Sequence, residues 1–135
     1  MIVVDTGVLY ASVDEDDADH VASAELLDGH PGPLLVPVPV LVETAWLTES
    51  RLGPSAEARF LAAARHEVER VDLIDGDWDR AVELIGTYAD LGLGLVDASV
   101  VAVAERHGVA QIATLDHRHF SVVRPRHVDA FELLP

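Results

Sequence analysis

Residues 91–120, LGLGLVDASVVAVAERHGVAQIATLDHRHF, carry the clearest structural pattern in this chain. Side chains at the spacing i, i+3, i+4 and i+7 lie on one face of a helix, and this spacing begins at Asp97 and ends before His107-Gly108. The residues on that face are Asp97, Val100, Val101 and Ala104. A second apolar run, residues 109–115, predicts a strand that ends just before Asp116.

Two acids therefore stand at the start of a predicted helix and at the end of a predicted strand. Open α/β sheets bind ligands at that edge, so Asp97 and Asp116 are candidate site residues. The alternative for Asp97 is a structural role as a helix N-cap, which accepts hydrogen bonds from free N–H groups.

Length and composition favour one globular domain, residues 1–135. Half of the residues are apolar, which is enough for a hydrophobic core. We expect no membrane span, because no apolar run is long enough, and no secretion signal, because Asp5 interrupts the first apolar run. The chain has no cysteine, which excludes disulfides and thiolate sites. A cytoplasmic protein is expected.

The distribution of charged residues supports two different interpretations. All nine basic residues are arginines, so functions that require a lysine, such as P-loop phosphate binding, are excluded. The net charge of −15 disfavours passive binding to nucleic acid. Residues 106–127, however, hold four arginines and four histidines against one acid. This basic segment is either a solvated surface or a phosphate-binding surface formed by Arg118, Arg124 and Arg126.

Strand-like and helix-like segments alternate along the chain. This order predicts an α/β fold with a central parallel sheet of about four to five strands flanked by helices. Strands are expected at residues 2–4, 34–36, 71–74, 109–115 and 128–134, and helices at 18–27, 40–52, 55–70, 77–90 and 97–107. Pro37 predicts an edge or a bulge for the second strand. The helix at 77–90 has an apolar face formed by Trp78, Ala81, Val82, Ile85 and Ala89.

Four carboxylates stand out by their surroundings: Asp5, Glu43, Asp97 and Asp116. Asp5 ends the first strand, and Glu43 is the only charge in VLVETAWL. Because strand C-termini and helix N-termini share one edge of a parallel sheet, the four side chains are expected to converge. Carboxylates that meet without a nearby cation repel one another. A divalent ion, Mg²⁺ or Mn²⁺, resolves that repulsion with all-oxygen ligands.

The segments VVDTGVLYA, LVETAWL, GLVDASVVAVAERHG and IATLDHRHF resemble, in order and spacing, the four acidic motifs of PIN-domain ribonucleases. The resemblance is strongest to the toxins of bacterial VapBC toxin–antitoxin pairs, and it covers essentially the whole chain. It implies a PIN fold and an Mg²⁺ or Mn²⁺ site at Asp5, Glu43, Asp97 and Asp116.

The same resemblance implies an activity and partners. The expected reaction is hydrolysis of RNA that leaves a 5′-phosphate, with Glu43 positioning or deprotonating the attacking water. Hydroxyls of Thr6, Ser99 and Thr114 would hold carboxylates or water. The expected partners are an RNA substrate, a cognate antitoxin and a second copy of the chain in a homodimer. The antitoxin is expected to dock as a helix against residues 40–70, in a groove formed by Leu41, Trp46, Leu47, Phe60 and Leu61.

The motifs also resemble other kinds of site. Asp5-Thr6-Gly7 matches the aspartic-protease triplet, but those enzymes are β-rich. A HAD-type phosphatase requires a second acid at position 7, which is glycine here. His117 and His119 are potential metal ligands, although alternating histidines on a loop more often lie at the surface. A PIN-like scaffold that binds RNA or protein without cleavage is the main alternative, and metal-dependent turnover separates it from a nuclease.

Overall fold

The computed structural model describes all 135 residues and contains five strands, seven α-helices and one short 3₁₀ helix. The strands are β1 (Ile2–Val4), β2 (Leu34–Pro37), β3 (Glu69–Val71), β4 (Gln111–Ala113) and β5 (Glu132–Leu134). The helices are α1 (Thr6–Val13), α2 (His20–Gly29), α3 (Val38–Leu52), α4 (Pro54–Glu67), α5 (Asp75–Thr87), η1 (Ala89–Leu91), α6 (Leu95–His107) and α7 (His117–Val122). No helix has the length and apolar character needed to cross a membrane.

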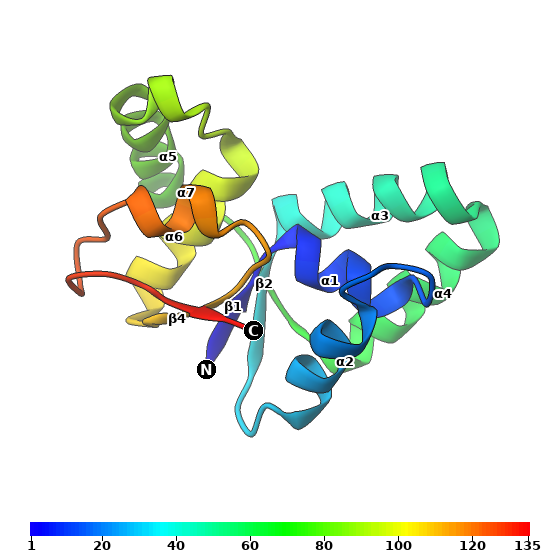
Figure 1. The fold of residues 1–135 in the computed structure, drawn as a ribbon. Coiled ribbons are helices and arrows are strands. Elements are labelled where there is room, and N and C mark those ends of the chain that lie inside the picture. Colours follow the sequence, from blue (N-terminus) through cyan, green and yellow to red (C-terminus); the bar gives the residue numbers. More distant parts are fainter.

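The five strands form one parallel sheet in the order β3-β2-β1-β4-β5. The predicted α/β class and parallel sheet are therefore confirmed. In Figure 1, α1 to α4 gather on the right of the view and α5 to α7 on the left, with the strands between them. The chain winds outward from β1 through β2 to β3, then returns to β4 on the other side of β1. β1 and β4 are therefore the only neighbouring strands from which the chain continues in directions away from each other, toward opposite edges of the sheet.

The hydrophobic core lies around the central strand β1 and the helix α6. All three residues of β1 are fully buried, as expected for a parallel strand covered on both faces. On α6, the predicted residues Val100, Val101 and Ala104 have no exposed surface, but every residue from 98 to 104 is buried, so the helix is covered on all sides and not on one face only. Gly108 ends this helix in the left-handed conformation, with φ of 66°, which glycine adopts without strain.

Two predictions about the strands were wrong. The strand expected at 71–74 lies at Glu69–Val71. Pro37 does not place β2 at an edge, because β2 lies between β3 and β1. Proline is tolerated there since it is the last residue of the strand and α3 begins directly after it. The missing N–H therefore interrupts no continuing ladder.

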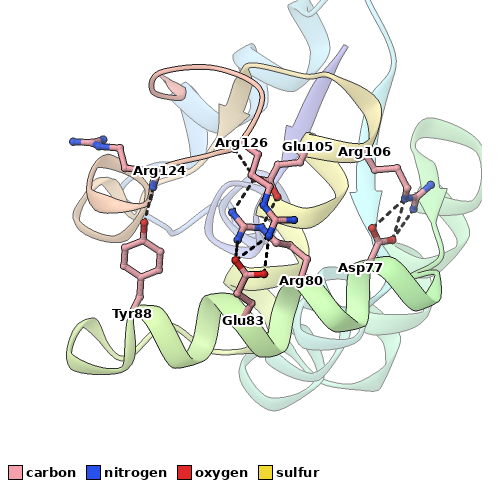
Figure 2. A network of polar contacts seen from close by, with 8 residues as sticks. All are labelled: Asp77, Arg80, Glu83, Tyr88, Glu105, Arg106, Arg124 and Arg126. Carbon is pink, nitrogen blue, oxygen red and sulfur yellow. Dashed lines mark hydrogen bonds and ion pairs between the residues drawn. The ribbon is translucent and has the colours of Figure 1, made fainter.

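The prediction for α5 was only partly right about which residues contact the protein. Ala81 is buried as expected, and so is Leu84, whereas Trp78 and Val82 are 48% and 73% exposed. The buried side of α5 also includes the charged residue Asp77, and α5 packs on α6 through ion pairs as well as apolar contacts (Figure 2). The buried carboxylate of Asp77 bonds to a guanidinium of α6, and this orients the helix.

The ion pairs of α5 form a network with the C-terminal segment (Figure 2). Arg80 binds both carboxylate oxygens of Glu105, at 2.8 and 3.0 Å. The Arg126 guanidinium lies 2.6 Å from Glu83, and its backbone N–H donates to Glu105 at 2.6 Å. The backbone N–H of Arg124 donates to the Tyr88 hydroxyl. These bonds fasten the chain that follows α7 to α5 and α6.

Candidate functional site

The candidate site lies where β1 and β4 lie side by side. Val4 pairs with Ala113 in the parallel register, so Asp5 and Thr114 follow at the same edge. The Asp5 N–H donates to the Ala113 carbonyl at 2.9 Å and extends this pairing by one residue. The connections from β1 and β4 leave toward opposite sides of the sheet, which is the topological switch point where open α/β sheets bind ligands.

Thr114 connects two of the predicted acids. Its hydroxyl donates to Asp5 Oδ2 at 2.9 Å and accepts the Asp116 backbone N–H at 2.9 Å. The expected role of Thr114 in holding a carboxylate is confirmed. Ser99 does not act in this way, because its hydroxyl donates to the Val96 carbonyl of its own helix. The buried Thr6 hydroxyl has no hydrogen-bond partner.

The Asp5 carboxylate is only 6% exposed. Burial raises the pKa of Asp5 to about 6, against hydrogen bonds from the Thr6 N–H and the Thr114 hydroxyl that lower it. The charges of Asp97 and Asp116 raise the pKa further. The protein therefore holds Asp5 in a place where its negative charge is poorly compensated.

Asp97 lies in the first turn of α6, and the helix N-cap is Gly94. The N-cap alternative for Asp97 is therefore wrong. Burial raises the pKa of the Asp97 carboxyl, while His119 lowers it through its charge and a hydrogen bond. The charges of Asp116 and Glu43 raise the pKa again, so Asp97 experiences both of these acids.

His119 is the residue that the sequence analysis undervalued. Residues 117–119 were expected in a surface loop, but they form the first turn of α7, with Asp116 as its N-cap. His117 is exposed, whereas His119 turns inward and is a third candidate ligand with Asp97 and Asp116, whose ligand atoms all lie within 4.8 Å of one another. The spacing Asp-x-x-His at the start of a helix was the available signal, because it places both side chains on one face.

Glu43 lies on α3 at the rim of the site. Its carboxylate is near enough for its charge to act on Asp97. The apolar enclosure expected around it is incomplete, because Val40 is buried but Trp46 is 63% exposed. Glu43 also lines a hollow of about 850 Å³ with Trp46, Trp78 and other residues of α3, α5 and α6.

The donors at this site suit a hard divalent cation. Asp97, Asp116 and His119 face one small region, and Asp5 lies near enough for the charges of Asp97 and Asp116 to raise its pKa. Carboxylate oxygens are the ligands of Mg²⁺ and Mn²⁺, and neutral imidazole is a common metal ligand in proteins. The residues therefore fit such an ion.

The basic segment offers fewer free cations than its sequence suggested. Arg126 is paired with Glu83, and the Arg124 guanidinium donates to the Ser121 carbonyl at 3.1 Å. Arg118 is exposed, and its guanidinium has no partner. Of the three arginines expected to meet phosphate, Arg118 alone presents an unengaged side chain.

The single groove expected against residues 40–70 is not present in the structure. Leu41 and Phe60 are buried, whereas Trp46 and Leu61 are exposed. Phe60 lines a hollow of about 780 Å³ between α1, α2 and α4, and Trp46 lines the separate hollow beside Glu43. The five residues therefore do not form one surface.

Comparison with known proteins agrees with this arrangement. The model of the PIN domain family matches residues 2–124. The chain is 32% identical to ribonuclease VapC26 of Mycobacterium tuberculosis (strain ATCC 25618 / H37Rv), over 99% of this chain and all of that protein.

Solved structures show the same fold. VapC20 of Mycobacterium tuberculosis, a toxin that cleaves the sarcin–ricin loop, superposes with a TM-score of 0.80 at 25% identity, over 87% of this chain and 91% of that one. VapBC2 from Rickettsia felis, bound to a DNA fragment from its promoter, matches over both full chains with a TM-score of 0.73 and 16% identity. A toxin–antitoxin complex from Klebsiella pneumoniae matches at 0.72 with 18% identity, over 91% of this chain and 92% of that one.

The family model matches residues 2–124, which include the strands β1 to β4, and ribonuclease VapC26 aligns with the chain from end to end. The chain belongs to the PIN domain family, and within it to the VapC-type ribonucleases.

Proposed function

We propose that this protein is a metal-dependent endoribonuclease and the toxin of a type II toxin–antitoxin pair. The observation that carries the proposal is the cluster of Asp97, Asp116 and His119 at the switch point of the sheet, beside Asp5, where burial and the charges of neighbouring acids raise the pKa of Asp5 and Asp97. Such a cluster is unfavourable in the folded protein unless a cation binds it. Family membership supplies the reaction class.

Each residue has a distinct part in the proposed reaction. Asp5, Asp97 and Asp116 hold the ion, and the Thr114 hydroxyl fixes the orientation of the Asp5 carboxylate. Glu43, at the rim, orients and deprotonates the attacking water. A bound Mg²⁺ or Mn²⁺ supplies a water of lowered pKa and stabilises the charge that develops on the phosphate. The products are an RNA 3′-hydroxyl and a 5′-phosphate.

An RNA hairpin with the sequence of the sarcin–ricin loop, the substrate of the similar VapC20 toxin, is a suitable first substrate. The purified protein should cleave this RNA, or total RNA, with Mg²⁺ or Mn²⁺ and not in EDTA. Asp97→Asn should abolish cleavage and leave the circular dichroism spectrum unchanged, because the side chain keeps its size. Asp79→Asn is the matched control, since Asp79 is exposed on α5 and away from the cluster.

The alternative is a PIN scaffold that binds RNA or protein without cleaving. All four acids are present, and two of them, Asp97 and Asp116, adjoin a candidate ligand histidine, which favours an active enzyme. Full cleavage in EDTA would exclude the metal mechanism. Binding of RNA without any metal-dependent cleavage would establish the scaffold.

The antitoxin is the proposed protein partner. The hollow between α1, α2 and α4 suits a helical segment, because it has an apolar floor that includes Leu9, Leu27 and Phe60. Its rim carries the acids Asp14, Glu15, Asp16, Asp28 and Glu67, which would attract a basic segment. Co-expression with the neighbouring gene product should yield a stable complex that does not cleave RNA. Recovery of a free, active toxin would count against this assignment.

A homodimer is the proposed assembly. Val42, Trp46, Trp78 and Leu95 are exposed around the hollow beside Glu43, and contiguous exposed apolar residues commonly mark protein interfaces. Light scattering of the purified protein should give a dimer mass. Trp46→Glu combined with Trp78→Glu should give a monomer, and a monomeric wild type would exclude the dimer.

A further inference from the structure

The ring of His119 lies between two carboxylates of the site. Its Nδ1 atom is 2.9 Å from Asp116 Oδ2 and 3.0 Å from Asp97 Oδ2. Its Nε2 atom is 3.1 Å from the Leu91 carbonyl oxygen. The ring is therefore held at both nitrogens, by elements from three parts of the chain.

The Leu91 carbonyl determines where the ring hydrogen lies. A carbonyl oxygen accepts hydrogen bonds and donates none, so Nε2 must carry a hydrogen. In a neutral ring, Nδ1 then presents a lone pair toward two carboxylate oxygens, which also present lone pairs. This arrangement requires a positive centre between the three atoms, either a proton on Nδ1 or a metal ion.

Building on the proposed function, we propose that Nδ1 of His119 is a ligand of the divalent ion, beside Asp97 Oδ2 and Asp116 Oδ2. Two ligands at right angles around an ion, each about 2.1 Å from it, are about 3.0 Å apart. The two distances from His119 Nδ1 match this separation. A ligating histidine ordinarily donates its other ring N–H to a carbonyl or carboxylate, and the Leu91 carbonyl occupies that place.

The first turn of α7 positions two of these groups, Asp116 and His119, relative to each other. The His119 backbone N–H donates to Asp116 Oδ1 at 3.0 Å, as an N-cap bond. That bond occupies one oxygen of Asp116 and leaves Oδ2 free toward Nδ1. The cap thus orients the carboxylate and the imidazole together, and the ring needs no rearrangement to bind an ion.

The site holds more negative charge than a single positive charge balances. Asp97 and Asp116 contact the ring of His119 directly, while Asp5 and Glu43 also act on this region through their charges. A divalent ion supplies twice the charge and reaches more of these oxygens. A nitrogen donor also distinguishes transition ions from Mg²⁺, because imidazole is a softer ligand than carboxylate. His119 should therefore favour Mn²⁺ over Mg²⁺.

Pulsed electron paramagnetic resonance of Mn²⁺ bound to the full-length protein tests this directly. A ligating imidazole gives a nitrogen hyperfine coupling to Mn²⁺, which carboxylates and water do not give. The coupling should be present in wild type, absent in His119→Gln and retained in His117→Gln. His117 is the matched control because it lies on the same helix turn and is exposed.

Titration of free Mn²⁺ and competition with Mg²⁺ give the second readout. His119→Gln should weaken Mn²⁺ binding at least about tenfold and Mg²⁺ binding less, so that the preference for Mn²⁺ falls. Bound Mn²⁺ without nitrogen coupling in wild type, or with coupling that persists in His119→Gln, would overturn the role of His119. Either result leaves the carboxylate-based nuclease intact. A wild type that binds no Mn²⁺ would overturn both, and the wild-type spectrum is informative whether or not the variant folds.

Discussion

Replacing Asp5 by asparagine should stabilise the metal-free protein at neutral pH. Burial raises the pKa of Asp5 from 3.8 to about 6 in the folded state. A raised pKa means that the folded protein binds this proton more tightly than the unfolded chain does. The contribution of Asp5 therefore favours folding fully below pH 3.8, and is lost as pH rises through about 6. Above that pH the ionised carboxylate opposes folding.

The shift of about two pKa units corresponds to about 3 kcal/mol between pH 4 and pH 8. Asparagine has no such charge, and its side-chain oxygen still accepts the hydrogen bond of Thr114. For a chain of this length, about 3 kcal/mol is on the order of 10 °C in melting temperature. The Asn variant should thus melt above wild type at pH 8 by up to this amount, and the difference should vanish near pH 4.

Thermal unfolding followed by circular dichroism, in EDTA and in Mn²⁺ across this pH range, provides the measurement. Mn²⁺ at a hundred times its dissociation constant should stabilise wild type by about 2.7 kcal/mol and Asp5→Asn far less. Asp79→Asn, an exposed substitution on α5, controls for the general loss of negative charge. The reasoning is refuted if Asp5→Asn melts below wild type in EDTA at every pH, or if Mn²⁺ stabilises all three proteins equally.

Four further substitutions test other contacts. Thr114→Val should lower the free energy of unfolding by about 1–3 kcal/mol in a urea titration, because Asp5 and a backbone N–H lose their partner. Asp77→Ala should destabilise by about 2–3 kcal/mol in the same titration, since the buried carboxylate pairs with a guanidinium and accepts a backbone N–H at the start of α5. Arg118→Ala should weaken RNA binding and reduce its salt dependence in a filter-binding assay, whereas Arg126→Ala should change both much less because that side chain is paired. Equal effects of the two arginine substitutions would contradict the latter distinction.

Local periodicity in the sequence was sufficient for the α/β class and the parallel sheet, but it did not predict the helices α1 and α7. The i, i+3, i+4 spacing correctly identified α6 as a helix, whose residues 98–104 are buried on all sides. The continuous apolar runs at β1 and β4 predicted buried parallel strands, because such strands are covered on both faces. The positions of Asp5 and Asp116 at the ends of these strands then placed them at one edge of the sheet.

Only the tertiary structure decided which side chains meet. The buried face of α5 was only partly predicted: Ala81 is buried, but Trp78 and Val82 are exposed, and the charged residue Asp77 is buried in an ion pair with Arg106 of α6. Periodicity describes one element at a time and says nothing of a partner on another element.

His119 shows the same limit at the site. As a sequence position it was one of two alternating histidines, and only its spacing of three residues from Asp116 distinguished it from His117. Its role depends on Asp97 and Leu91, which are 22 and 28 positions away in the chain. The elements α6 and η1 bring these two residues to opposite sides of the His119 ring. A side chain's charge and ligands depend on such distant neighbours, and these are set by the packing of helices around the switch point of the sheet.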